Sequence, residues 1–467
     1  MSGIGIDFGT SNSVAAFYDG KDIRLVNLED EDAIMPTAIH LNRELQPKTG
    51  QNAINQYISE NMNRIVELTP EVIAKTTIIG SEYQSPSSEG DGSNLADVFG
   101  KPVVDRGMPG RLFRGIKRLL GTDSLRRLMV FDRPFRVVAL ITPIFLRIRK
   151  SIEIALHEPI NRVHCGHPVV FEGRQRNSNS VAFSKLSEAC SHAGISNVTF
   201  YPEPVAATLS YLYSNTSLKS GNVLAFDFGG GTMDLSVIRF EENRFKVLAT
   251  EGLPLGGDHI DQLLFKEFLS PSLGKGELWS RVRDGKLVES EFPFDEIEEK
   301  LLNWTVTYML NQNQYRSNIV ERINQGGSGA QKFERLLDLI TNNYSYLVFQ
   351  EIRKAKAAIS SADFSQIDIP ELDLTIDISR TDLERIMASM LQEIEIAIDE
   401  VLKRSNIGVK DITIVVRTGG SSQIASVKTM LGKKFPNKVV EHNPFTSVAI
   451  GLAIASYHDL DFDPNQT

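Results

Sequence analysis

The sequence predicts an α/β protein built from two similar halves. The stretches "GIDFGTSNS" at residues 5 to 13 and "VLAFDFGGGTMDLSVIRF" at residues 223 to 240 follow one plan. In each, an apolar strand runs into an aspartate, a glycine turn with hydroxyl residues and a second apolar strand. The length of 467 residues leaves room for about two to four domains. We therefore expect each half to give one hairpin to a shared cleft.

The residues of these turns indicate what the cleft would bind. One isolated copy is an ordinary hairpin-turn sequence, and its repetition is what favours a ligand site. Glycine turns present backbone N–H groups, and Thr10 and Ser11 add hydroxyls, so the turns suit phosphate oxygens. Asp7 and Asp227 can lie beside one polyphosphate only with a divalent cation between them, and Mg²⁺ prefers such oxygen ligands and retained waters.

Composition limits the classes of function. The formal net charge of -9 gives no basic footprint, so nucleic acid is not expected as a partner. Cys165 and Cys190 have no metal-ligand spacing and are expected to be small buried residues in a reducing compartment. The longest apolar stretch, "VVALITPIFL", is too short to cross a bilayer, and no leader is expected because Asp7 interrupts the first apolar run. The expected location is cytoplasmic.

The remaining elements follow from periodicity, capping residues and breakers. Residues 81–94 are expected to be a solvated loop, and residues 270–350 are mainly helical in pattern with a glycine-rich loop at "NQGGSGA". The other expected elements are a helix over 137–158 that contains Pro143, a strand in 162–171, a helix over 178–195, a strand in 371–380, a helix over 381–404, and a strand, turn and helix from 411.

Seven strings, in order, carry a family resemblance: "IGIDFGTSNS", "FRGIKRLLG", "YPEPVAATLSY", "FDFGGGTMDLSVI", "GLPLGGDHID", "ISRTDLERI" and "TGGSSQI". From about residue 3 to 457 the chain resembles the ATPase domain of the seventy-kilodalton heat-shock chaperones of the DnaK type, and specifically short members that lack a peptide-binding domain. This resemblance implies the actin-like ATPase fold, with two lobes, a central mixed β-sheet flanked by helices in each, and a nucleotide cleft between them. Lobe I would span residues 1–217. Lobe II would span 218–467, with a helical insertion at about 275–350 and a C-terminal helix that returns to lobe I.

The resemblance also assigns residues to a site for ATP or ADP with Mg²⁺, with K⁺ as a further candidate. Asp7, Glu203 and Asp227 match positions that hold the metal, and Lys117, Thr232 and Asp227 match catalytic positions. The matching nucleotide-binding positions are Gly9, Thr10, Ser11, Asn12, Gly229, Gly230, Gly231, Thr232, Gly257, Lys356, Ser360, Gly419, Gly420, Ser421 and Gln423.

Some of these residues also have plain structural interpretations. Lys117 lies among arginines and, without the resemblance, is better explained as one more solvated cation. Glu203 precedes a proline and could simply favour a helix N-terminus, and Asp234 could be a hairpin residue.

The chain departs from the family at the adenine end of the site. The helix "IRKAKAAISS" carries Arg353 and Ala357 where the family has a glutamate and an arginine that stacks on the base. Gln423 replaces another arginine, and Phe445 stands where the family has an aspartate. We therefore expect weak adenine selectivity, with Phe445 as an alternative cover for the base.

The leading hypothesis is an ATP-hydrolysing, chaperone-like protein that couples nucleotide state to lobe closure, with a client or co-chaperone supplied by another chain. One alternative is an ATP-sensing binding or scaffold protein with little hydrolysis. A second is a small-molecule kinase on the same fold, although no acidic base facing an acceptor pocket is evident. Fold alone does not choose between them.

Overall fold

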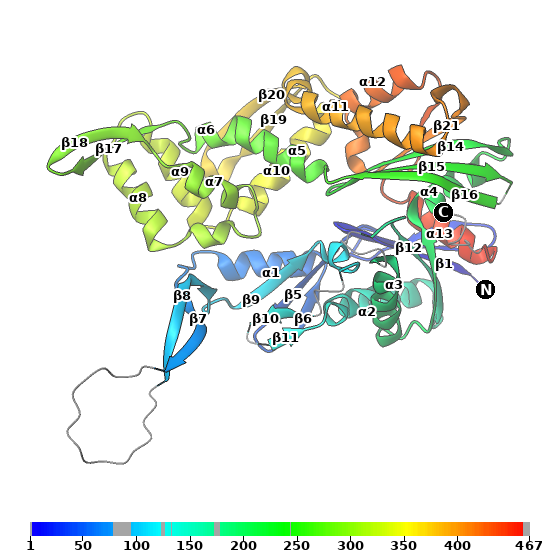
Figure 1. The fold of residues 1–467 in the computed structure, drawn as a ribbon, viewed down its shortest axis with the longest axis horizontal. Coiled ribbons are helices and arrows are strands. Elements are labelled where there is room, and N and C mark those ends of the chain that lie inside the picture. Colours follow the sequence, from blue (N-terminus) through cyan, green and yellow to red (C-terminus); the bar gives the residue numbers. More distant parts are fainter. Residues whose placement is uncertain are drawn as a thin grey trace, which may run out of the picture.

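The computed structural model describes residues 2–77, 95–122, 127–131, 133–171, 178–242 and 244–460. It contains two mixed β-sheets with helices packed around them, one in the lower and one in the upper half of the view (Figure 1). The predicted fold class is therefore confirmed. The loop expected at 81–94 lies outside the described residues.

The first sheet has the strand order β13-β12-β1-β2-β3, with the short β4 beside β2. Strands β1 to β3 form an antiparallel meander, whereas β12 and β13 run parallel to β1. Strand β1 is almost wholly buried, as expected for a central strand that is covered on both faces. The bounds are Gly3–Phe8 for β1, Asn12–Tyr18 for β2, Ile23–Val26 for β3, Met35–Pro36 for β4, Arg162–His167 for β12 and Asn197–Pro202 for β13.

The second sheet repeats this plan with the order β16-β15-β14-β21-β22. Here β14 to β16 form the antiparallel meander, and β21 and β22 run parallel to β14. The bounds are Ser220–Phe228 for β14, Met233–Glu241 for β15, Arg244–Leu253 for β16, Ile414–Thr418 for β21 and Val439–Glu441 for β22. Asp7 and Asp227 are each the second-last residue of the first meander strand, so the sequence repeat reflects a repeated sheet.

Helices cover both sheets. They are α2 (Val137–Leu156), α3 (Ser178–His192), α4 (Glu203–Ser214), α5 (Gly257–Leu264), α11 (Arg380–Ser405), α12 (Ala425–Lys434) and α13 (Ser447–Tyr457). The expected helices at 137–158, 178–195 and 381–404 are confirmed, and Pro143 is accommodated inside α2. Helix α11 begins with a capping box between Ser379 and Asp382, which satisfies its first free N–H groups.

Helix α13 packs against β1, far from it in sequence. A Cβ atom on Gly3 would lie 2.3 Å from the Tyr457 backbone nitrogen, and one on Gly5 would lie 2.3 Å from the Ala449 carbonyl oxygen. No side chain fits at either position, so glycine allows the helix to lie directly on the strand.

The outer part of the first half contains a three-stranded sheet, helix α1 and an extended two-stranded ribbon that projects away from the body (Figure 1). The bounds are Ala38–Asn42 for β5, Pro47–Thr49 for β6, Gly110–Arg114 for β9, Gln51–Asn61 for α1, and Leu68–Thr77 and Leu95–Asp105 for the ribbon strands β7 and β8. A small hairpin pairs β10 (Leu128–Val130) with β11 (Arg133–Phe135).

The outer part of the second half is helical, but it also contains a hairpin that the sequence analysis did not predict. Strands β17 (Leu278–Arg283) and β18 (Lys286–Glu291) pair antiparallel at the far end of the molecule (Figure 1). The helices are α6 (Ser270–Ser272), α7 (Asp295–Leu301), α8 (Asn313–Asn324), α9 (Ala330–Thr341) and α10 (Ser345–Ile359), and a further hairpin joins β19 (Phe364–Ile369) to β20 (Leu374–Ser379).

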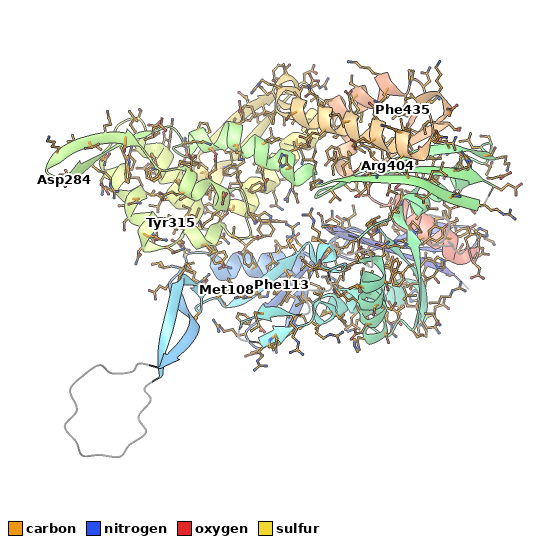
Figure 2. All side chains as sticks on the ribbon, viewed as in Figure 1. Met108, Phe113, Asp284, Tyr315, Arg404 and Phe435 are labelled. Atoms are coloured by element: carbon orange, nitrogen blue, oxygen red, sulfur yellow. The ribbon has the colours of Figure 1, made fainter. Side chains whose placement is uncertain are left out.

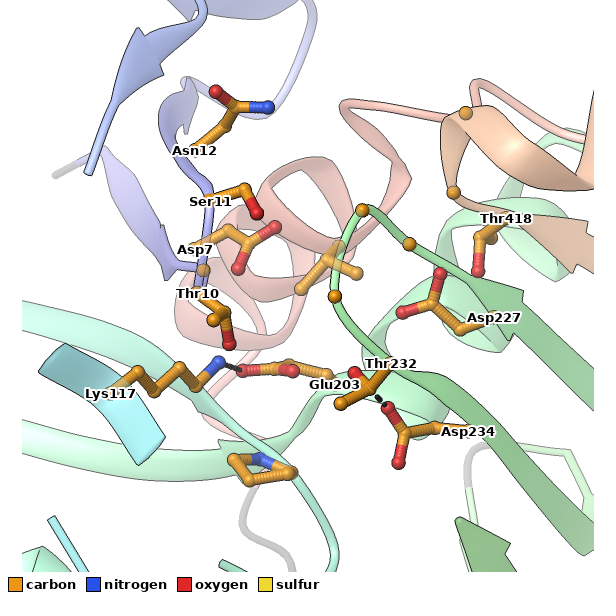
Figure 3. A pocket seen from close by; sticks show the side chains of 18 of the residues that line it. Asp7, Thr10, Ser11, Asn12, Lys117, Glu203, Asp227, Thr232, Asp234 and Thr418 are labelled. Atoms are coloured by element: carbon orange, nitrogen blue, oxygen red, sulfur yellow. Dashed lines mark hydrogen bonds and ion pairs between the residues drawn. The ribbon is translucent and has the colours of Figure 1, made fainter. Parts of the chain in front are cut away.

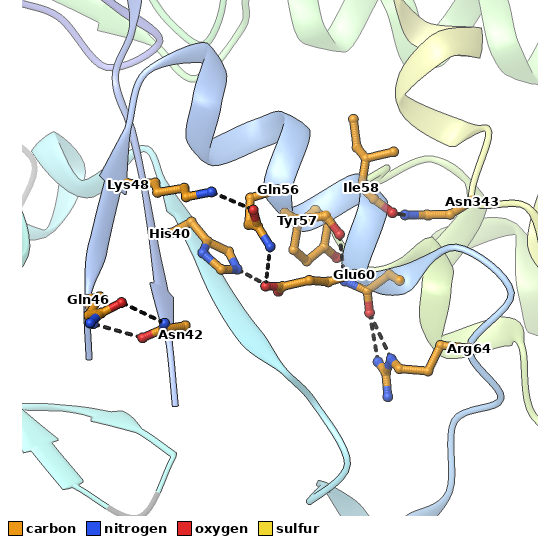
Figure 4. A network of polar contacts seen from close by, with 11 residues as sticks. His40, Asn42, Gln46, Lys48, Gln56, Tyr57, Ile58, Glu60, Arg64 and Asn343 are labelled. Atoms are coloured by element: carbon orange, nitrogen blue, oxygen red, sulfur yellow. Dashed lines mark hydrogen bonds and ion pairs between the residues drawn. The ribbon is translucent and has the colours of Figure 1, made fainter. Parts of the chain in front are cut away.

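These two outer parts meet in a buried interface. Tyr57 and Val66 belong to the same apolar cluster as Trp304 and Tyr308, and all four are at most 6% exposed. Main-chain hydrogen bonds cross between the parts, from Asn63 N to Thr341 O at 2.7 Å and from Val66 N to Asn311 O at 2.8 Å. Figure 4 shows the α1 side of this contact, where Asn343 donates to the Ile58 carbonyl oxygen. The outer parts therefore share one core.

Candidate functional site

The two hairpin turns of the sheets face each other. Gly9 joins β1 to β2, and a Cβ atom there would lie 2.3 Å from the Asn12 carbonyl oxygen, so this close turn needs glycine. On the other side, Gly229 N donates to Thr232 O at 3.0 Å and closes the second turn. A Cβ atom on Gly230 would lie 3.0 Å from Ser11 Oγ, which brings the turns nearly into contact.

A cavity of about 550 Å³ lies between these turns and is lined from both halves of the chain. Figure 3 shows its polar side chains pointing inward from strands, turns and one helix start. Of the predicted site residues, the cavity is lined by Asp7, Gly9, Thr10, Ser11, Asn12, Lys117, Glu203, Asp227, Gly229, Gly230, Gly231, Thr232, Gly419 and Gly420. The structure thus brings together residues that are more than 400 positions apart.

Lys117 and Glu203 form an ion pair at the cavity wall. Lys117 lies in the single 3-10 turn Ile116–Leu119, which follows Gly115 in the left-handed region, and Glu203 is the first residue of α4. Lys117 Nζ donates to Glu203 Oε1 at 2.5 Å, and the side chains are only 8% and 16% exposed (Figure 3). Burial would lower the pKa of Lys117, but Glu203 and Asp7 outweigh it and raise that pKa, so the lysine stays charged.

The carboxylates at the cavity repel one another. Burial, with Glu203 and Asp227 nearby, raises the pKa of Asp7 to about 8. Burial, with Asp234 and Glu203 nearby, raises the pKa of Asp227 to about 7. Asp234 itself accepts a hydrogen bond from Thr232 Oγ1 at 3.0 Å. The cavity therefore holds more negative charge than Lys117 balances.

This surplus of buried carboxylate charge fits a divalent cation with oxygen ligands. Within the described residues, no three acidic, histidine or cysteine side chains are close enough to ligate one metal ion directly. The residues therefore fit a Mg²⁺ ion held through its waters, since Mg²⁺ usually keeps several of them.

Five predicted nucleotide-binding residues do not line the cavity. Lys356 Nζ is bound to Asp261, which is 1% exposed, and to the Gly257 carbonyl oxygen at 2.9 Å. Gly257 N donates to Gly229 O at 3.0 Å, and Ser421 Oγ donates to the same oxygen at 3.0 Å. Gly257 and Ser421 thus bind the main chain of the second turn, and Lys356 binds Gly257. These polar atoms are therefore already engaged with other protein groups.

The other two are also placed elsewhere. Ser360 Oγ donates to Lys356 O, one turn back in its own helix, at 3.3 Å. Gln423 Nε2 is buried and has no hydrogen-bond partner among the described residues. Arg353 forms ion pairs with Asp258 and Asp261. None of the α10 cations, Arg353, Lys354 and Lys356, lines the cavity.

Sequence analysis missed several lining residues, which are Val14, Ile34, Arg118, Pro168, Val170, Phe171, Gly252, Leu253, Pro254, Thr418, Pro444, Ser447 and Val448. Five of them, Arg118, Gly252, Leu253, Pro254 and Thr418, lie inside the quoted family motifs, which therefore already held a signal for them. Phe445, noted as a possible base cover, lines the cavity with a ring that is 51% exposed. A Cβ atom on Gly420 would lie 2.8 Å from that ring, so the phenyl group rests on the glycine turn.

Both cysteines are buried and free. Among the described residues, no helix combines the length and apolarity that a membrane crossing requires. The expectation that Cys165 and Cys190 are buried is confirmed.

Comparison with known proteins shows which family and which relatives this chain resembles. The chain is 23% identical to the chaperone protein DnaK 3 of a Synechococcus species and 23% identical to the chaperone protein DnaK of Mycoplasmopsis pulmonis. Each alignment covers 97% of this chain but 57% of the relative, so the chain spans little more than half the length of these proteins. A chaperone protein HscA homolog of Rickettsia bellii is 24% identical over 63% of this chain and 43% of its own length. The family described as Hsp70 protein matches residues 119–277 and 330–457, which hold Glu203, Asp227, the second sheet and α13, and this chain therefore belongs to the Hsp70 family.

Proposed function

We propose that the chain is a slow, Mg²⁺-dependent ATPase of chaperone-like type that couples its nucleotide state to movement of the lobes. The observation that carries this proposal is the cavity itself, where two glycine-hydroxyl turns, the carboxylates of Asp7 and Asp227, and the Lys117–Glu203 pair converge. We also propose the division into lobe I, residues 1–217, and lobe II, residues 218–467, because it gives each lobe one sheet and one turn.

In this proposal the turns bind phosphates. Backbone N–H groups at Gly9 to Asn12 and Gly230 to Thr232 would donate to phosphate oxygens, helped by the hydroxyls of Thr10 and Ser11. Asp7, Glu203 and Asp227 would accept hydrogen bonds from the water shell of the metal. Mg²⁺, when bound, supplies positive charge that offsets the charge on the phosphate groups.

Lys117 would stabilise the charge that develops on the γ-phosphate, and it is buried where such a charge acts strongly. Thr232 and Asp227 would orient the attacking water from the opposite side.

A second candidate function, an ATP-sensing scaffold with little hydrolysis, is favoured by the buried interface between the outer parts. Two main-chain hydrogen bonds and a shared apolar core oppose any large opening or closing of the lobes. A client or co-chaperone would in either case be another chain.

Steady-state ATP turnover with and without Mg²⁺ tests the first candidate and separates it from the second. We expect turnover that depends on Mg²⁺ and falls in Asp227→Asn, measured alongside Asp377→Asn, which changes an aspartate on the distant strand β20. Tight nucleotide binding without turnover would support the scaffold. Turnover stimulated by added sugars or polyphosphate would instead support a kinase.

A further inference from the structure

The hairpin of β17 and β18 lies in a segment, residues 278–329, that the Hsp70 family match leaves out. It is a well-formed hairpin. Asp284 and Gly285 make a two-residue turn with positive φ values of 50° and 73°, the conformation that matches the twist of the strands. Asp284 marks the tip of the hairpin, at the far end of the molecule (Figure 2).

One face of the hairpin anchors it to the protein. Trp279 is 5% exposed and packs against Phe292, with ring centroids 5.1 Å apart, and Phe292 packs on Phe333 at 4.7 Å. Arg281 lies over the Trp279 ring at 4.1 Å. The hairpin is thus held in a fixed position by its inner face.

The outer edge of β17 is closed by helix α8. The Gln325 side chain donates to Ser280 O at 2.7 Å and accepts from Ser280 N at 2.9 Å, as a neighbouring strand would. Arg322 Nε donates to Leu278 O at 2.6 Å. Side chains of α8 therefore take the place of a third strand on this side.

The outer edge of β18 is open. Because Ser280 turns its N–H and C=O away from β18, its cross-strand neighbour Glu289 turns its own away from β17. The same alternation applies to Leu287 and Glu291. No described residue pairs with these outward groups, and all six residues of β18 are exposed.

The solvent-facing side of this edge has a distinct pattern. Val282 and Leu287 face each other across the hairpin and are 72% and 74% exposed, which forms an apolar row at the tip. Glu289 and Glu291 follow on the same side and make no ion pair with any described residue. A third strand would place one side chain in the apolar row and two beside the glutamates.

We propose that the open edge of β18 binds an extended segment of a partner protein by strand addition, with an apolar residue beside Leu287 and lysine or arginine beside Glu289 and Glu291. Main-chain hydrogen bonds at residues 287, 289 and 291 supply the pairing, and the glutamates select a basic segment. A second copy of this chain is disfavoured, because pairing two β18 edges would bring like charges together. This surface is separate from the nucleotide cavity and does not depend on the proposed ATPase function.

The test uses the full chain and a capped, fluorescent peptide of about eleven residues. Every second residue of the peptide is threonine, and the residues between the threonines are, in order, lysine, lysine, leucine, lysine and lysine. The symmetric series suits either strand direction. A peptide with glutamate in place of lysine is its control. Saturable binding of the lysine peptide, and at least about tenfold weaker binding of the glutamate peptide, is expected.

Glu289→Pro removes the outward N–H but spares the pairing with β17, so it should weaken peptide binding by about tenfold or more. Glu289→Thr keeps the N–H and should weaken binding only a few-fold, while Glu289→Lys should shift preference toward the glutamate peptide. Buried Trp279 reports by fluorescence whether each variant keeps the hairpin. Absence of saturable binding, equal binding to Glu289→Pro, or dimerisation through this edge would overturn the proposal.

Discussion

Lys117 and Glu203 are joined by a buried hydrogen bond of 2.5 Å, in which the lysine ammonium donates to the carboxylate. The lysine lies in the 3-10 turn Ile116–Leu119, and the glutamate is the first residue of α4. The charge of Asp7 also raises the pKa of Lys117. One ammonium group therefore interacts with more than one carboxylate in the cavity. Both the proposed chemistry and the electrostatic balance of the cavity depend on this pair.

Replacing Lys117 by alanine should lower ATP turnover by roughly 10²- to 10³-fold, the scale for losing one preorganised charge. Nucleotide binding should be largely kept, because the glycine turns and hydroxyls remain. Turnover and calorimetric affinity are measured on the same preparation. Lys354→Ala is the matched control, since that lysine is 72% exposed on α10. Equal turnover in wild type and Lys117→Ala would remove this residue from the mechanism.

Without a divalent cation, the protein should lose stability as the pH rises from about 6 to 8.5. The pKa values of Asp7 and Asp227 are raised to about 8 and about 7, so the folded chain keeps protons that the unfolded chain has released. Unfolding then releases protons, and a higher pH favours it. Thermal melts in a pH series check this, and added Mg²⁺ should raise Tm more at pH 8 than at pH 6. A Tm that is flat over this range, and equally flat in Asp227→Asn, would contradict it.

Asn311→Ala should destabilise the interface between the outer parts by about 1 to 3 kcal/mol, because it strips partners from buried polar groups. Asn311 is 1% exposed, and its Nδ2 donates to Arg64 O at 2.8 Å. Its neighbour Asn313 is exposed, so Asn313→Ala is the control. Denaturant unfolding gives the stability change, and stopped-flow release of a fluorescent nucleotide should be faster in Asn311→Ala. Unchanged release with reduced stability would show that this interface does not control the cavity.

Phe445→Ala should weaken ATP and GTP about 2- to 10-fold while leaving tripolyphosphate binding unchanged, since only a base can stack on the ring. Phe445 is half exposed and lines the cavity, whereas no α10 cation lines it. Titration calorimetry with the three ligands measures this, with exposed Phe364→Ala as the control. In the wild type, ATP and GTP should bind within about tenfold of each other. Strong rejection of GTP would mean that another group selects the base.

The repeated Asp-Gly-Thr hairpins could be predicted because each is local, and two copies are visible in the chain. Contacts between segments that are far apart in the chain could not be predicted, because local residue patterns do not show which segments will lie side by side. Arg417 lies inside an apolar strand, and its partner comes from parallel pairing with β22, which places Glu441 beside it with Nη2 and Oε2 3.2 Å apart. Lys356 matches a nucleotide-binding position of the family, but in the structure it forms an ion pair with Asp261 on α5. The residue spacing within α10 cannot indicate this pair, because Asp261 belongs to another helix. The missed hairpin did have a local signal, because the Asp284-Gly285 turn lies between the runs LWSRVR and KLVESE, in which polar and apolar residues mix. The helical interpretation of this region obscured that signal.

The packing of α13 on Gly3 and Gly5 also affects how the chain folds during its synthesis. Strand β1 ends at Phe8, and the helix that covers it begins only at Ser447. At about 5 to 20 residues per second, the ribosome needs roughly 20 to 90 s to reach that helix. During this period the face of β1 that α13 later covers stays exposed on the nascent chain. Contacts between segments so distant in sequence are also slow to form. The sheet that contains β1 can therefore be covered only after α13 has been made, and an apolar face left exposed on an incomplete chain favours aggregation.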